Sequence, residues 1–60
     1  MTEQEMLRRD IDGLRESIRL NFVDLERLNL SPEDREGIRT NTRLLMDELA
    51  ALLNRLETLR

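Results

Sequence analysis

Cysteine and histidine are both missing from this chain of 60 residues, and proline and phenylalanine each occur once. Without Cys the chain can form neither a disulfide nor a thiolate metal site. Without His it lacks the commonest general base and metal ligand of proteins. Asp10, Asp12 and Glu16 lie close in the sequence, but arginines surround them and no His completes a metal site. We therefore expect no enzymatic activity, no metal and no cofactor.

Long hydrophobic runs are absent as well. No uninterrupted apolar stretch approaches the roughly 20 residues of a membrane span, and no basic segment followed by an apolar one marks a signal peptide. We therefore expect a cytoplasmic protein that does not bind membranes. The net charge of −3 also argues against nucleic acid as a partner.

The chain is too short for a large hydrophobic core. The single core of so short a chain contributes only roughly 3–5 kcal/mol to the free energy of unfolding, so we expect association with another chain to stabilise the fold.

Two helix starts can be recognised in the sequence. Thr2 followed by Glu5 forms a capping-box pattern. Ser31 followed by Pro32 supplies an N-cap and a residue suited to the first helical position. Just before them, Asn29 can adopt the left-handed conformation that ends many helices. These signals divide the chain into two helical segments joined by a short turn.

We accordingly predict an all-α, single-domain protein. The expected elements are a helix at about 3–28, a turn at 29–31 and a helix at about 32–59. So short a connection makes the helices neighbours in an antiparallel hairpin. Because the first start signal includes the initial Met, we also expect the chain to be a complete product.

Apolar residues recur at alternating steps of four and three, as positions a and d of a heptad. They are Leu7, Ile11, Leu14, Ile18, Leu25 and Leu28 in the first segment, and Ile38, Leu45, Leu49, Leu52, Leu56 and Leu59 in the second. Asn21 and Thr42 interrupt the two series, and folding the chain at its turn places them in one layer. We interpret this layer as a polar device that fixes the alignment of the helices; coincidence is the alternative.

The two edges of the predicted hairpin differ in character. Phe22, Met46 and Leu53 fall at position e, beside the a/d stripe, and position g carries polar residues. An apolar stripe this wide is more than two helices can cover, and it is typical of helix bundles. We therefore expect Phe22, Met46 and Leu53 to form the self-association surface of a homodimeric four-helix bundle.

Two further groups of residues are candidate binding surfaces. Leu20 and Val23, possibly with Leu44, are apolar but lie on the outside, where another protein could dock. The alternative is that they are ordinary exposed aliphatic residues.

Three arginines spaced four residues apart form a ridge of side chains suited to nucleic acid. They are Arg35, Arg39 and Arg43. A solvated helix surface is the alternative, since acidic residues lie in the same turns and no aromatic residue is interleaved.

We thus predict a small non-enzymatic regulator or adaptor that self-associates and binds another protein through helical surfaces. A dimeric RNA- or DNA-binding regulator that uses the ridge from Arg35 to Arg43 is the alternative. A structural assembly subunit is a further alternative.

Overall fold

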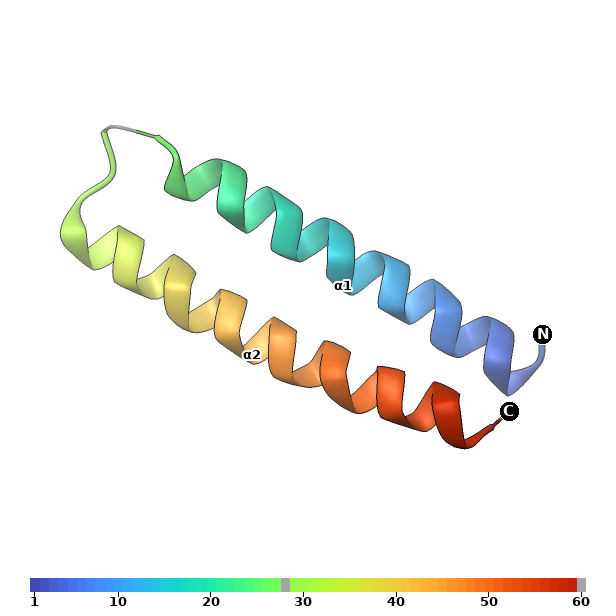
Figure 1. Cartoon of the computed structure of the whole chain (residues 1–60). Helices are drawn as coiled ribbons and strands as arrows, with labels where there is room; N and C mark the ends of the chain where they lie inside the picture. Colours follow the sequence, from blue (N-terminus) through green and yellow to red (C-terminus); the bar gives the residue numbers. More distant parts are fainter. Residues whose placement is uncertain (28, 60) are drawn as a thin grey trace.

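A computed structural model describes residues 1–27 and 29–59, and these form two helices with no strand among them. Helix α1 spans Glu3–Leu25 and helix α2 spans Pro32–Thr58. The helices run antiparallel, side by side, and the two termini lie at the same end of the molecule (Figure 1). The Cα trace measures 44 × 16 × 12 Å. The predicted helical hairpin is therefore confirmed. Within the described residues, no helix is long and apolar enough to span a membrane.

Both helix starts are capped by the side chains that the sequence indicates. The hydroxyl of Thr2 accepts a hydrogen bond from the backbone N–H of Glu5 at 3.1 Å. The hydroxyl of Ser31 accepts one from the N–H of Asp34, also at 3.1 Å, and Pro32 is the first residue of α2. Each hydroxyl thereby satisfies one of the N–H groups that a helix start leaves without a partner.

The end of α1 differs from the prediction. The helix ends at Leu25 instead of near residue 28, with Glu26 as its C-cap in a right-handed conformation. Because the C-cap is Glu26, the prediction that Asn29 ends this helix is wrong. The predicted a/d residue Leu28 lies outside the described residues. Helix α2 ends at Thr58, close to the expected boundary.

Arg35 provides the physical reason for this different ending. Its Nη1 donates a hydrogen bond to the carbonyl oxygen of Leu25 at 2.8 Å, and its Nη2 donates one to the carbonyl oxygen of Arg27 at 2.6 Å. Carbonyls at a helix end need donors, and a guanidinium supplies several in a fixed geometry. The first turn of α2 thus satisfies the last turn of α1, and no left-handed residue is required.

Replacing Arg35 with Met should therefore destabilise the hairpin. Met keeps most of the aliphatic stem but removes two charge-assisted hydrogen bonds, so we expect the free energy of unfolding to fall by about 1–2 kcal/mol. Urea denaturation at a fixed protein concentration measures this change. Arg9→Met, at an exposed position of α1, is the matched control and should shift the free energy by at most about 0.5 kcal/mol. Equal effects of the two substitutions would contradict the capping role.

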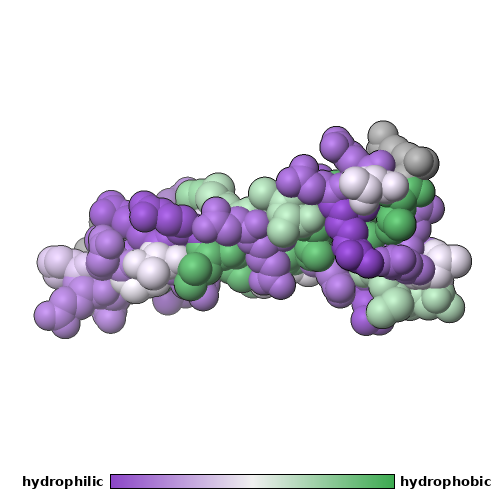
Figure 2. Space-filling view, turned by 90° about the horizontal axis from the view of Figure 1, so that it is seen from below, coloured by the Kyte–Doolittle hydropathy of each residue, from purple (hydrophilic) through white to green (hydrophobic). Residues whose placement is uncertain are grey.

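Burial is uneven between the two helices. In α1 the side chains of Leu7, Ile11 and Ile18 are buried, whereas the buried residue of α2 is the polar Thr42. The apolar a/d residues within α2 are all only half-buried: Ile38, Leu45, Leu49, Leu52 and Leu56. Seen from the α2 side, hydrophobic side chains emerge between hydrophilic ones in the middle of the rod and towards the end with the termini (Figure 2). One hairpin therefore leaves much of its own core stripe in contact with water.

Candidate functional site

Asn21 and Thr42 lie in one layer and contact each other. Nδ2 of Asn21 donates hydrogen bonds to Oγ1 of Thr42 at 3.0 Å and to Oδ1 of Asn41 at 2.9 Å. The hydroxyl of Thr42 in turn donates to the carbonyl oxygen of Ile38 at 2.7 Å. Only 5% of Thr42 is exposed, so its hydroxyl depends on these partners in place of water. A shift of one helix along the other would break the two bonds that Asn21 donates.

The hydrogen bond between Asn21 and Asn41 was not predicted from the sequence. Asn41 is at position g, next to Thr42 along the chain. An Asn directly beside a polar core position was the feature of the sequence that could have predicted this contact.

A second contact between the helices, also not predicted, lies at the other end of the rod. Nε and Nη2 of Arg55 both donate to Oε1 of Glu3. Because both side chains are at least half exposed, this pair is worth at most about 1 kcal/mol.

Position g of the two helices forms what we call the polar edge. Its residues are Glu3, Asp10, Ser17, Asp24, Asp34, Asn41, Glu48 and Arg55. The hydrogen bonds that join Asn41 and Arg55 to the opposite helix both lie here. A shallow hollow of about 440 Å³ opens beside the turn on the same side. Its lining residues are Asn21, Leu30, Glu33, Asp34, Gly37, Ile38 and Asn41.

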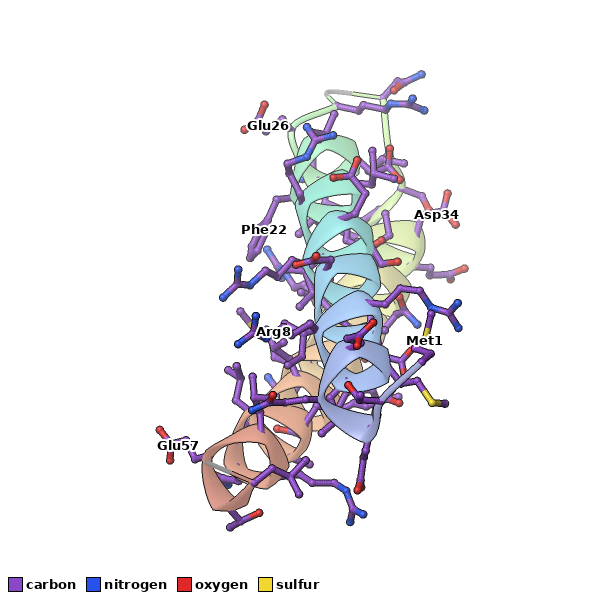
Figure 3. The ribbon with its side chains drawn as sticks, turned by 90° about the vertical axis from the view of Figure 1, so that its right-hand side faces the viewer. Met1, Arg8, Phe22, Glu26, Asp34 and Glu57 are labelled. Carbon is purple, nitrogen blue, oxygen red and sulfur yellow. The ribbon has the colours of Figure 1, made fainter. Side chains whose placement is uncertain are left out.

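Position e of the two helices forms what we call the apolar edge. Its residues are Arg8, Arg15, Phe22, Arg39, Met46 and Leu53. The exposed fractions are 47% for Phe22, 47% for Met46 and 38% for Leu53. Figure 3 places Phe22 and Arg8 on one side of the hairpin and Asp34 on the other. The structure thus brings the predicted self-association residues to one side, where they remain uncovered in the single chain.

A shallow groove of about 240 Å³ runs into the apolar edge. Phe22 of α1 and Met46 of α2 both line it, together with Leu25, Arg39, Thr42 and Arg43. Leu25 and Thr42 belong to the a/d layers, so the groove reaches from the surface to the core between the helices. An apolar side chain that entered this groove would extend the core of the hairpin.

The candidate partner-contact residues point away from the core. The exposed fractions are 49% for Leu20, 46% for Val23 and 63% for Leu44. Leu20 directly precedes Asn21, and Leu44 follows Thr42 by two residues, so both flank the polar layer. These side chains lie off the apolar edge, since Leu20 and Val23 occupy outer positions of α1 and Leu44 an outer position of α2.

The arginine ridge of α2 is not a continuous basic surface. The guanidinium of Arg35 binds two carbonyl oxygens at the end of α1. Nη1 of Arg39 lies 4.0 Å from a carboxylate oxygen of Glu36, and Arg43 lines the groove of the apolar edge. Three side chains that the sequence spacing groups together therefore have three different environments, which weakens the case for nucleic-acid binding.

The closest ion pair within one helix joins Arg19 and Glu16, at 2.6 Å. The hydrogen bond from Arg19, and then its charge, lower the pKa of the Glu16 carboxyl, and the same contacts raise the pKa of Arg19. A lowered carboxyl pKa stabilises the helix above the pKa of an unfolded Glu, and this contribution is lost as the pH falls through the lowered value. Because both side chains are mostly exposed, the effect on stability is small.

Glu16 therefore pairs with an arginine instead of joining Asp10 and Asp12 in a carboxylate cluster. In the part of the chain that the structure describes, no group of three Asp or Glu residues is arranged to hold a metal ion.

Comparisons with protein-family models, curated proteins and solved structures found no match to this chain. The function is accordingly argued from the geometry of the hairpin itself.

Proposed function

We propose that this chain is a small non-enzymatic regulator or adaptor, which acts as a homodimer and binds another protein through an outer helical surface. The observation that carries the proposal is the incomplete burial of the hairpin. The apolar a/d residues of α2 from Ile38 to Leu56 stay half-buried, and Phe22, Met46 and Leu53 lie beside them. Burying apolar surface contributes about 25 cal/mol per Å², so covering this stripe with a second hairpin is favourable.

The dimensions of the hairpin suit such a dimer. Its broad side measures 44 × 16 Å at the level of Cα atoms, which is an area of about 700 Å². A stable protein–protein interface buries about 800 Å² on each partner. Two hairpins that pack broad side to broad side therefore bury close to the area that a stable dimer needs, and together they make a four-helix bundle.

Leu20, Val23 and Leu44 would remain outside this dimer and are the proposed contact for a different protein. They lie off the apolar edge, so association of two copies leaves them exposed. A partner helix with an apolar stripe could dock across them. Full burial of one such side chain is worth roughly 1.5–3 kcal/mol, so three partly exposed ones can anchor a micromolar complex after the cost of association.

Replacing Leu20 and Val23 with Ser tests this contact. A tagged chain and its variants would be cross-linked in extracts of the native host, and the captured proteins compared by quantitative mass spectrometry. We expect the wild-type chain to enrich a specific partner and the double variant to lose at least about tenfold of that enrichment, while sedimentation equilibrium still gives a dimer. The lost contact area of two aliphatic side chains is the reason.

Ala51→Ser, at another exposed outer position of α2, is the control and should retain the partner. A double variant that captures the partner as well as the wild type would remove this surface from the proposal. A double variant that becomes monomeric would show that Leu20 and Val23 belong to the dimer interface.

A further inference from the structure

We propose that the two copies pack apolar edge to apolar edge with their turns at the same end of the bundle. This inference rests on the proposed dimer and adds to it the direction in which the second copy is seated. The groove between Phe22 and Met46 makes the apolar edge the open side of the core. The polar edge, in contrast, carries the bonds that join Asn41 and Arg55 to the opposite helix.

The alignment of the two helices determines which apolar-edge residues lie at the same level. The hydrogen bond between Asn21 and Thr42 and the ion pair between Glu3 and Arg55 fix this alignment at two points along the rod. Counting heptads from them puts one arginine and one apolar residue at each level of the edge. The three pairs are Arg8 with Leu53, Arg15 with Met46, and Arg39 with Phe22.

Two-fold symmetry leaves two ways to stack such hairpins with their helices aligned. With the symmetry axis parallel to the helices, the turns lie at the same end and α1 of one copy lies over α2 of the other. With the axis perpendicular to the helices, the turns lie at opposite ends and α1 lies over α1. Neighbouring helices of different copies are antiparallel in both arrangements, so the side chains of the apolar edge decide between them.

The same-end arrangement places every arginine of the edge against an apolar side chain of the other copy. Arg15 then meets Met46, and Arg8 meets Leu53, so the aliphatic stems cover the apolar groups while the guanidinium groups reach water. Arg39 meets the ring of Phe22, where a guanidinium is attracted to the aromatic face. These contacts repeat on both sides of the symmetry axis.

In the same-end arrangement, two carboxylates of each copy also lie near arginines of the other copy. Glu26 lies near the turn and Glu57 near the termini, and Figure 3 shows both on the side of the hairpin that carries Phe22 and Arg8. When the turns coincide, Glu57 of one copy is near the level of Arg8 of the other, and Glu26 is near the level of Arg39. Opposite charges thus meet at both ends of the interface.

At full overlap the opposite-end arrangement also sets Arg8 against Phe22 and Arg39 against Leu53, so the two arrangements differ at the middle level, at Arg15 and Met46. The opposite-end arrangement brings Arg15 of one copy against Arg15 of the other at the middle of the interface, and like charges in contact oppose association. Sliding the copies by half a heptad separates the two guanidinium groups. That shift, however, offsets the two copies by about 5 Å along the rod and reduces the buried apolar area.

Distances between spin labels on two copies distinguish the arrangements. Because the chain has no Cys, single nitroxides can be attached through Glu33→Cys, near the turn, or Thr58→Cys, near the termini; both positions are exposed. Pulsed dipolar EPR would be recorded on each labelled variant and on a mixture of the two, after sedimentation equilibrium has shown the mass of each. We expect labels at the same position to lie about 20–30 Å apart, which is the width of a four-helix bundle with its labels.

For the mixture we expect an additional, longer distance that approaches the 44 Å length of the hairpin. The reverse pattern, with the short distance only in the mixture, would overturn the same-end arrangement and leave the dimer intact. A monomeric mass with no dipolar coupling between copies would overturn the proposed dimer, and the orientation with it. If the distances from the Glu33→Cys and Thr58→Cys variants indicate the same arrangement, a local effect of either label is excluded as their cause.

Discussion

A chain with both Phe22→Arg and Met46→Arg should be a monomer at concentrations where the wild-type chain is a dimer. Both side chains line the groove of the apolar edge, and in a two-fold dimer each substitution occurs twice. The change removes apolar contact area and adds charge to an edge that already carries Arg8, Arg15 and Arg39. We expect the dissociation constant of the dimer to rise at least about 1,000-fold, which corresponds to about 4 kcal/mol.

Sedimentation equilibrium over a range of concentrations measures this effect, and circular dichroism reports how much helix survives in the monomer. Leu20→Arg with Leu44→Arg is the matched control. It adds the same charge and also replaces two exposed apolar side chains, but on the outer surface, so the dimer should persist. If the variant with both Phe22→Arg and Met46→Arg remains dimeric, or if the control dissociates to the same extent, the apolar edge is not the self-association surface.

Replacing Thr42 with Val and replacing the whole polar layer should change stability in opposite directions. Val has nearly the shape of Thr, but Thr42→Val removes the acceptor of the hydrogen bond from Asn21. We expect the free energy of unfolding to fall by about 1–2 kcal/mol, because the amide of Asn21 loses one of its two acceptors in a partly buried layer. Adding Asn21→Leu should raise stability above that of the wild type by about 1–3 kcal/mol, since apolar packing then replaces the layer.

This gain in stability should be accompanied by a less well-defined alignment. Without the bonds from Asn21 the two leucine stripes can slide by a heptad at small cost, as in coiled coils that lose a buried Asn. Urea denaturation of the wild type, both single variants and the double variant gives the coupling between the two positions. An excess of amide signals in the NMR spectrum of the double variant would reveal several alignments. A double variant that is less stable than the wild type would show that the layer stabilises the fold instead of specifying it.

Local signals explain why much of the hairpin was predictable. A helix N-cap depends on a hydroxyl and an N–H group three residues later, so Thr2 and Ser31 could be assigned from adjacent residues. The layer shared by Asn21 and Thr42 follows from two heptad series and the short turn that joins them. Each of these inferences requires only helical periodicity and the length of a connection.

Contacts between distant positions were not predictable in this way. Arg35 donates to Leu25, ten residues earlier, and Arg55 pairs with Glu3, 52 residues earlier. Many exposed arginines and carboxylates could form such pairs in a chain with 38% charged residues, and nothing in the local pattern selects among them. This is why α1 was expected to end with a left-handed Asn29, whereas a guanidinium from α2 satisfies its last carbonyls.

The sequence by itself determined that the chain forms two amphipathic helices, where each begins, and that Asn21 and Thr42 lie in one layer of the hairpin. These properties depend on capping hydroxyls and on the heptad period, which act within a few residues. Only the tertiary structure decided how α1 ends and how far the core is covered. Periodicity indicates which side of a helix is apolar, whereas burial depends on how much surface the neighbouring helix can cover, and here one neighbour leaves the a/d leucines of α2 only half-buried.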